Sequence, residues 1–295
     1  MIISSKKIVW DKCYLCGSPS LNNFYKKKEI VKCKNCSFVF YQPIPSKEDL
    51  DLVYSKYERE EYITQGSINK IKKELEKILV DHNIKTILDI ACGECYFLDI
   101  FKSIDPSLDL YATEHFSAKE NVIKKGYKFI DGEFFPITEK KFDLVIFTEA
   151  IEHINDVSNF LEHVYNLLDP NGLIYITTPN FSCLERFLMG QNWGMVVPPE
   201  HLSYFTPKTL NLVMKKNGFV KKFCKTENIS IYRIIQFFNK INKKNNPKIS
   251  PQKISDKLQR ASNSNYFLRF SRDSVNKILN FLNLGSSIKA LYQKK

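Results

Sequence analysis

The sequence predicts an α/β fold built on a doubly wound, mostly parallel sheet, with a cysteine-rich segment before it and a basic segment near its C-terminus. Two observations predict the sheet. From Thr86 onward, short apolar runs alternate with segments whose apolar residues recur at helical spacing, as in a βαβ succession. Nearly every residue within those runs is apolar, which indicates strands buried on both faces. The strands are expected at residues 86–91, 108–112, 142–147 and 173–177.

Composition and punctuation divide the 295-residue chain. Pro43 and Pro45 close a segment rich in cysteine, lysine and aromatic residues, and an amphipathic helix is expected at residues 66–83. Further strands at residues 218–225 and 286–293 flank a run of basic helices. The predicted domains are residues 1–45, a helical linker or lid at 46–83, a core at 84–230, a basic helical insertion at 231–283 and a final edge strand at 284–295.

Hydropathy and charge limit where the protein can be located and which partners it can bind. The chain has no apolar run of about 18 residues, and residues 1–12 lack the apolar stretch of a signal peptide, so we expect a cytoplasmic protein. The net charge of +12 lies in residues 231–295, which hold 14 basic and two acidic residues. This excess is either a solvated helical surface or a surface for an anionic partner. Such a partner would be a phosphate group, nucleic acid, or the headgroups at the inner face of a membrane.

Four of the eight cysteines have the spacing of a zinc ribbon. Cys13 and Cys16 form one Cys-x-x-Cys pair, and Cys33 and Cys36 form a second pair after an intervening stretch of 16 residues. Two such pairs supply the four thiolates of a tetrahedral zinc site. Because four cysteines fill the coordination shell, the sequence predicts a structural zinc ion rather than a catalytic one.

A cofactor site is expected at the end of the first strand of the sheet. Residues 87–95 are typical of a strand that enters a tight turn before a helix, where backbone N–H groups meet an anionic ligand. Glu114, which lies 25 positions after Asp89 at the end of the next strand, can accept both ribose hydroxyls of an adenosine cofactor. Two alternatives are an NAD site and a redox pair formed by Cys92 and Cys95.

At these residues the sequence resembles the class I S-adenosylmethionine-dependent methyltransferases. Their glycine motif usually reads Asp-x-Gly-x-Gly-x-Gly. This chain has Asp89, Ala91, Gly93 and Cys95 at the four fixed positions, so two of the three glycines are replaced.

The resemblance continues through residues 45–225, with an acidic residue after the second strand and Thr-Thr-Pro-Asn at 177–180. It implies a seven-stranded, mostly parallel sheet and S-adenosylmethionine as the cofactor. Asp89 and Gly93 would hold the amino-acid end, Glu114 the ribose, and Asp131 or Gly132 the adenine. The predicted cofactor-binding residues are Asp89, Ala91, Gly93, Glu114, Asp131, Gly132 and Thr148.

Candidate catalytic residues follow the 142–147 strand. Glu149, Glu152 and His153 lie where the transferable methyl group should be, and His201 lies in a later segment expected to fold back over the site. The histidines could remove a proton from the acceptor or position it. The pattern is similar to ubiquinone-biosynthesis O-methyltransferases and RNA 3′-terminal ribose methyltransferases. That likeness implies a second possible role, in which these four residues bind Mg²⁺ or Mn²⁺. A third possibility is that the Glu–His pair is structural.

A zinc ribbon before such a core resembles bacterial methyltransferases that modify sugars. The predicted function is therefore methylation of a hydroxyl, or else a carbon, of a nucleotide-linked or lipid-linked sugar in surface-polysaccharide or related biosynthesis. One alternative is metal-assisted methylation of an RNA ribose, with the basic insertion on the phosphate backbone. The other is a non-catalytic zinc-ribbon adaptor, which the two missing glycines keep open.

Overall fold

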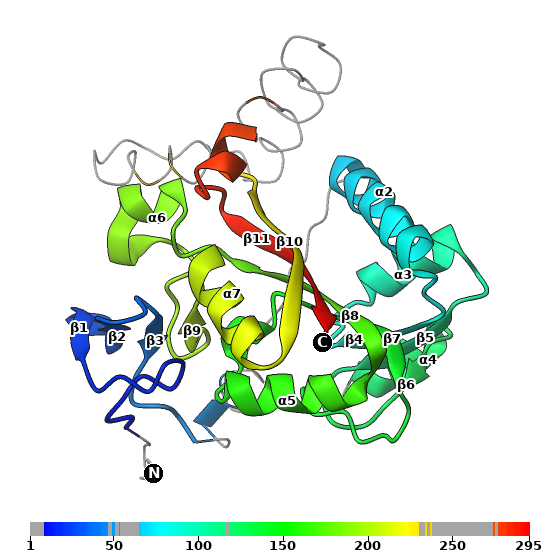
Figure 1. The fold of residues 1–295 in the computed structure, drawn as a ribbon, viewed down its shortest axis with the longest axis horizontal. Helices are drawn as coiled ribbons and strands as arrows, with labels where there is room; N and C mark the ends of the chain where they lie inside the picture. Colours follow the sequence, from blue (N-terminus) through cyan, green and yellow to red (C-terminus); the bar gives the residue numbers. More distant parts are fainter. Residues whose placement is uncertain are drawn as a thin grey trace.

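A computed structural model of the chain describes residues 9–46, 65–115, 118–229 and 277–295, together with positions 49, 50, 53, 234, 237 and 274. Within these residues the chain forms a seven-stranded sheet with helices on both faces and a four-stranded sheet beside it (Figure 1). The larger sheet has the strand order β10-β11-β8-β7-β4-β5-β6. The predicted fold class, a doubly wound, mostly parallel α/β sheet of seven strands, is confirmed.

The five strands from β6 to β8 in this order run parallel, whereas β11 is antiparallel to both of its neighbours. Their carboxyl ends therefore meet at one edge of the sheet, which is where ligands bind in open α/β folds. The strands are β4 (Thr86–Ile90), β5 (Asp109–Thr113), β6 (Lys128–Phe129), β7 (Phe142–Thr148), β8 (Leu168–Pro179), β10 (Phe219–Glu227) and β11 (Ser287–Lys294).

Two hydrophobic clusters cover the two faces of this sheet. Leu75 of α2 and Leu98 of α3 pack on one face, and Phe160 of α5 and Leu210 of α7 pack on the other. Local capping fixes where the second pair of helices begins, since Asp156 caps α5 and a Thr206–Thr209 capping box precedes α7. The helices are α2 (Gln65–His82), α3 (Tyr96–Ile104), α4 (Lys119–Lys124), α5 (Val157–Leu167), α6 (Leu184–Met189) and α7 (Pro207–Lys216), with 3₁₀ turns η1 (Lys26–Lys28), η3 (Ile151–His153) and η4 (Gly190–Asn192).

The last strand of the chain is not an edge strand, which corrects the prediction for residues 284–295. β11 lies between β8 and β10, and residues on both of its faces are buried, including Ile288 and Leu291. β10 forms the edge instead, and much of it is exposed. The order of strands along the chain did not predict their order in the sheet, because the final strand pairs in the antiparallel direction between two earlier strands.

The Asp169–Gly172 stretch lies within β8 rather than in a separate turn before it. The register between β7 and β8 shifts here, so the stretch is an irregularity in the ladder. Asn171 has a left-handed φ of 66°. The tight turn is therefore present, but strand pairing resumes on both sides of it.

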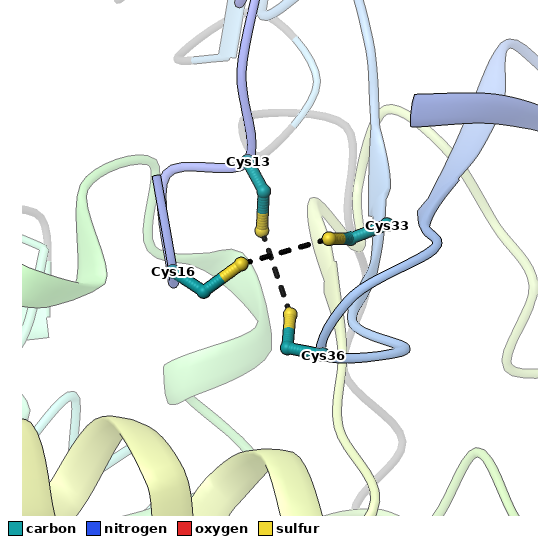
Figure 2. Close-up of side chains that lie close together, drawn as sticks. All are labelled: Cys13, Cys16, Cys33 and Cys36. Carbon is teal, nitrogen blue, oxygen red and sulfur yellow. Dashed lines mark hydrogen bonds between the residues drawn. The ribbon is translucent and has the colours of Figure 1, made fainter. Parts of the chain in front are cut away.

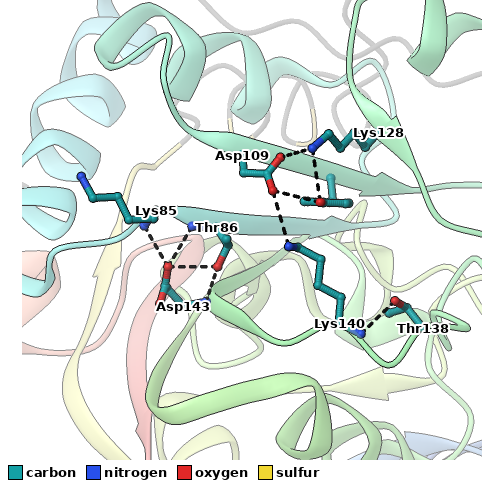
Figure 3. A network of polar contacts seen from close by, with 8 residues as sticks. Lys85, Thr86, Asp109, Lys128, Thr138, Lys140 and Asp143 are labelled. Carbon is teal, nitrogen blue, oxygen red and sulfur yellow. Dashed lines mark hydrogen bonds and ion pairs between the residues drawn. The ribbon is translucent and has the colours of Figure 1, made fainter.

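The amino ends of the strands carry a polar network on the edge opposite the ligand-binding edge (Figure 3). One carboxylate oxygen of Asp143 accepts hydrogen bonds from the backbone N–H groups of Lys85 and Thr86 and from the Thr86 hydroxyl, at 2.8–2.9 Å. Asp109 forms ion pairs with Lys128 and Lys140. These contacts join the starts of β4, β5 and β7, so they stabilise the sheet without approaching the ligand edge.

The N-terminal segment forms the smaller sheet, whose strands are β1 (Leu21–Tyr25), β2 (Ile30–Cys33), β3 (Val39–Tyr41) and β9 (Ser203–Tyr204). The last strand comes from the core, so the two parts of the chain share a sheet. The hydroxyl groups of Tyr14 and Ser203 lie 2.6 Å apart across the same junction. Phe38 and Phe40 belong to the same hydrophobic cluster as Phe160, which means that the N-terminal sheet is packed against the core.

Most of the predicted basic insertion at residues 231–283 lies outside the described residues. Its anionic partner therefore stays a prediction, as do the membrane surface, the nucleic acid and the proposed domain boundaries. No helix in the described part of the chain is both long and apolar enough to cross a bilayer.

Candidate active site

The loop after β4 has three left-handed residues in alternation. Ala91, Gly93 and Cys95 have φ values of 55°, 53° and 59°. They occupy the three glycine positions of the motif that the sequence resembles. The backbone therefore keeps the glycine conformation even where the side chain is not glycine. A left-handed residue other than glycine costs roughly 1–2 kcal/mol, so the loop retains its shape at an energetic cost.

Hydrogen bonds join this loop to the end of β5 and to the segment after β6. The Gly93 N–H donates to Glu114 Oε2 at 2.6 Å, and the Ala91 N–H donates to Thr113 Oγ1 at 3.3 Å. The Thr113 hydroxyl in turn donates to the Glu133 carbonyl at 2.5 Å. Three predicted cofactor-binding segments thus meet at the carboxyl edge, with an acid at the ribose position.

The remaining predicted cofactor residues lie on the same edge. Asp131 is exposed and forms an ion pair with Lys119 at 3.3 Å. Gly132 has a φ of 95°, and a Cβ atom there would lie 2.1 Å from the Phe135 carbonyl oxygen, so only glycine fits. Asp89 is buried within β4, and Thr148 is half-buried at the end of β7. This arrangement of acidic side chains, a glycine with positive φ and a left-handed loop fits the binding of S-adenosylmethionine.

The acceptor side brings together Glu152, His153 and His201. One ligand atom from each lies within 4.8 Å of the others, and all three side chains are buried. Glu152 and His153 come from η3, directly after β7, whereas His201 comes from the segment before β9. The two imidazole rings are nearly perpendicular, at 86°, with centroids 4.8 Å apart.

The hydrogen bonds of the two histidines fix their tautomers. His153 Nδ1 lies 2.9 Å from the Glu200 carbonyl, and His201 Nδ1 lies 2.9 Å from the Met195 carbonyl. Because a carbonyl oxygen can only accept, both Nδ1 atoms carry hydrogen, and Nε2 is the second nitrogen of each ring. Burial lowers the pKa of His201 to about 4, so the ring is neutral near pH 7. A neutral Nε2 can accept a proton or bind a metal ion.

The structure does not bring Glu149 into this cluster, although the sequence pattern predicted it. Its side chain is exposed, and its backbone has a left-handed φ of 49°. The backbone N–H of Glu149 donates to the Thr177 carbonyl at 2.9 Å, which holds the residue at the turn between β7 and η3. The turn therefore separates Glu149 from Glu152, despite their short separation in sequence.

Two supporting residues were missed by the sequence reasoning. The Thr178 hydroxyl donates to Glu152 Oε2 at 2.8 Å and orients that carboxylate. Glu200 supplies the carbonyl for His153, and its carboxylate lies 3.9 Å from His201 Nε2. Thr178 belongs to the Thr-Thr-Pro-Asn stretch, so its position was a usable signal. A contact through a backbone carbonyl leaves no such signal in the sequence.

The four cysteines of the N-terminal sheet converge on one point (Figure 2). The sulfur atoms of Cys13 and Cys36 lie 3.7 Å apart and those of Cys16 and Cys33 lie 3.6 Å apart. A tetrahedral zinc ion with Zn–S distances of about 2.3 Å requires sulfur separations of about 3.8 Å. Burial raises the pKa of Cys13 to about 11, so a cation is needed to hold all four groups as thiolates. The geometry fits a structural zinc ion.

Comparison with known proteins identifies the family. A model of a methyltransferase domain matches residues 60–221, and the chain belongs to this family. It is a class I S-adenosylmethionine-dependent methyltransferase. The chain is 30% identical over 219 residues to the ubiquinone biosynthesis O-methyltransferase of Pelagibacter ubique, a match that spans 66% of this chain and 87% of that protein.

A second relative is the mitochondrial ubiquinone biosynthesis O-methyltransferase of Homo sapiens, 28% identical over 47% of this chain and a third (33%) of that protein. Coclaurine N-methyltransferase bound to N-methylheliamine and S-adenosylhomocysteine shares the fold, with a TM-score of 0.50 and 10% identity over 81% of this chain and 74% of that chain. These relatives do not support the predicted sugar acceptor, since the two sequence relatives are named for ubiquinone biosynthesis. The architectural likeness behind that prediction rested on the ribbon, which lies outside the matched residues.

Proposed function

We propose that the protein transfers the methyl group of S-adenosylmethionine to a ring hydroxyl, on a quinone precursor or a related phenol, at the Glu152–His153–His201 cluster. The observation that carries the proposal is the convergence of a buried carboxylate and two buried imidazoles at the carboxyl edge of the sheet. The names of the sequence relatives support a hydroxyl acceptor and favour a ring over a sugar.

Bound S-adenosylmethionine supplies an electrophilic methyl group on a sulfonium. The protein's part is to align the acceptor oxygen with that carbon and to remove the hydroxyl proton. We expect Glu114 and the N–H of Gly93 to hold the cofactor. They hydrogen-bond to each other in the structure, and cofactor binding would replace that contact. The Nε2 atom of His153 or His201 would receive the proton, because the other nitrogen of each ring, Nδ1, is bonded to a backbone carbonyl.

The same three residues can instead hold a divalent metal ion, which would lower the pKa of the acceptor hydroxyl. One carboxylate and two imidazoles suit Mn²⁺ better than Mg²⁺, which prefers oxygen ligands. The orientation of both histidines by backbone carbonyls matches the outer contacts that metal-binding histidines usually make. Proton acceptance and metal binding are therefore alternatives at one site.

The proposal is tested by labelled methyl transfer from S-adenosylmethionine to three probes, namely catechol, UDP-N-acetylglucosamine and a short RNA. We expect label on catechol oxygen. Label only on the sugar or only on RNA would contradict the ring acceptor. Each assay is repeated with EDTA and after addition of Mn²⁺ or Mg²⁺, while the zinc content is measured to confirm that the ribbon is intact. Activity lost with EDTA and restored by Mn²⁺ assigns the cluster to a metal ion, and unchanged activity assigns it to proton transfer.

A further inference from the structure

A cavity of about 500 Å³ lies where the N-terminal sheet meets the core. This is the size of pocket that holds a small ligand in many proteins. One wall belongs to the N-terminal sheet and its 3₁₀ turn η1, and the other belongs to the segment that leads to His201. The residues used below are Lys27, Lys28, Tyr41, Val196, Pro198 and Glu200.

The cavity adjoins the acceptor cluster through Glu200. The carbonyl of Glu200 accepts the His153 Nδ1 hydrogen at 2.9 Å, and its carboxylate lies 3.9 Å from His201 Nε2. Because Glu200 also lines the cavity, a ligand there would contact a residue that itself contacts both histidines.

Backbone hydrogen bonds hold the two walls in a fixed relation to the cluster. The Glu152 carbonyl accepts from the Leu202 N–H, and the Leu202 carbonyl accepts from the Tyr41 N–H, both at 2.8 Å. Tyr41 lines the cavity, so the ribbon wall is joined to the backbone of Glu152 through a single intervening residue, Leu202. The ammonium group of Lys28 donates to the Val196 carbonyl at 2.5 Å and joins the walls at another point.

The lining combines apolar surface with two lysines and two glutamates. Valine and proline side chains at residues 196–199 and the Tyr41 ring make the apolar part. Lys27 and Lys28 bring positive charge, while the nearby Glu29 carboxylate accepts a hydrogen bond from the Tyr41 hydroxyl at 3.1 Å. The Glu29 carboxylate lies against the Tyr41 hydroxyl and the Glu200 carboxylate against His201. The two lysines are therefore the part of the lining that suits an anionic group on an apolar ring.

The ribbon wall is additional to the shared methyltransferase core. The family match covers residues 60–221, so it includes the wall around Pro198 but neither Lys27, Lys28 nor Tyr41. A pocket built from both parts can therefore select an acceptor that the core alone would not distinguish.

We infer that this cavity is the acceptor subsite, and that the ribbon acts as a specificity element in which Lys27 and Lys28 bind a carboxylate or phosphate group on the methylated ring. The inference rests on the proposed function, because it assumes a ring acceptor at the neighbouring cluster. The zinc ribbon then has a role in substrate selection as well as in folding.

The test compares three catechols that share the reacting ring, namely catechol itself, 3,4-dihydroxybenzoate and (3,4-dihydroxybenzyl)phosphonate. We expect the wild-type protein to prefer an anionic catechol in kcat/KM. In the Lys27→Gln/Lys28→Gln double variant that preference falls at least about fivefold, the scale of two partly exposed charge pairs. Lys26→Gln is the matched control, since Lys26 lies on the same turn but does not line the cavity. The carboxylate and phosphonate probes separate the two anion classes.

Calorimetric binding of the same compounds, with S-adenosylhomocysteine present, keeps the two claims distinguishable. Anion-selective binding that is lost in the double variant and kept in Lys26→Gln supports the subsite, even if no methyl transfer is seen. Binding without any methyl transfer would contradict the proposed function but not the subsite. Methylation of catechols with the same anion preference in all three proteins would overturn the subsite while leaving the proposed function intact. Absence of any anion-selective binding to the wild-type protein would also overturn the subsite.

Discussion

The rings of His153 and His201 meet nearly at right angles, 4.8 Å apart between centroids, although they come from distant parts of the chain. Each donates its Nδ1 hydrogen to a backbone carbonyl, so both present Nε2 as the reactive nitrogen. A histidine kept only for packing would not need this shared orientation. The pair is therefore the part of the proposed acceptor site that mutation tests most directly.

Replacing His201 with Gln should lower kcat by about a hundredfold or more, the usual effect of losing a group that receives a proton or holds a metal ion. Cofactor affinity should stay within about twofold, because His201 lies on the acceptor side. Steady-state kinetics and calorimetry with S-adenosylmethionine measure the two effects separately. His163→Gln is the control, since that ring lies on α5 and contacts the Pro136 carbonyl. Equal kcat in both variants would remove His201 from the mechanism.

Replacing Glu114 with Ala should weaken S-adenosylmethionine binding by at least about tenfold, through loss of the carboxylate predicted to hold the ribose hydroxyls. Glu94→Ala provides the comparison, because Glu94 lies in the loop after β4 that Glu114 contacts but is exposed. Calorimetric Kd values decide the matter, with the melting temperature measured to show that both variants fold. Unchanged affinity in Glu114→Ala would mean that the cofactor lies elsewhere.

Replacing Ala91 with Gly should leave the protein as stable as wild type or stabilise it by up to about 1 kcal/mol, because glycine adopts the left-handed φ of 55° without strain. Ala112→Gly, at a buried β5 position, should instead destabilise the protein by about 1 kcal/mol. Urea unfolding of both variants gives the comparison. If Ala91→Gly proved as destabilising as Ala112→Gly, the loop would not be strained.

Replacing Cys33 with Ser should remove the zinc ion and lower the melting temperature, because a four-thiolate site contributes directly to folding. Elemental analysis of the purified wild-type protein should give about one zinc ion per chain. Cys183→Ser should retain the metal, since Cys183 is equally buried but lies outside the cluster. Full zinc content in Cys33→Ser would rule out the four-cysteine site.

Replacing Glu227 with Gln should cost stability near neutral pH but not in acid. Burial alone would raise the pKa of Glu227, but the ammonium groups of Lys289, Lys70 and Lys225 outweigh burial and lower it from 4.5 to about 2. A depressed carboxyl pKa stabilises the fold above the unfolded value of about 4.5, and this contribution is lost as the pH falls towards 2. It is on the order of 3 kcal/mol.

Melting temperatures of wild type and Glu227→Gln should therefore differ most near pH 7, and the difference should shrink below pH 4.5 and vanish only as the pH reaches about 2. Glu120→Gln, at an exposed position of α4, should show no such dependence. A gap that stayed constant with pH would mean that the carboxylate charge of Glu227 does not stabilise the fold.

The sequence predicted much of this structure because its signals are local. Apolar runs placed β4, β5 and β7 within a residue or two, and the paired Cys-x-x-Cys spacing predicted the cysteine cluster. The motif predicted the tight turn after β4, and positions 91 and 95 keep a left-handed backbone there although they are alanine and cysteine.

Features that depend on long-range placement were not predictable in the same way. β9 is a two-residue strand that joins the N-terminal sheet from far along the chain, and no periodicity marks so short a segment. Glu149 fits the spacing of a catalytic set, but a left-handed turn separates it from Glu152. Glu200 acts through its backbone carbonyl, which every residue has.

The most direct test of the central claim is the position of the labelled methyl group after reaction with catechol, comparing the wild-type protein with Glu152→Gln. We predict an O-methyl catechol from the wild-type protein and at least about a hundredfold lower kcat from the variant, with S-adenosylmethionine affinity preserved. Methylation at carbon or nitrogen of the acceptors tested, or equal O-methylation by the variant, would contradict a hydroxyl-directed site at Glu152, His153 and His201.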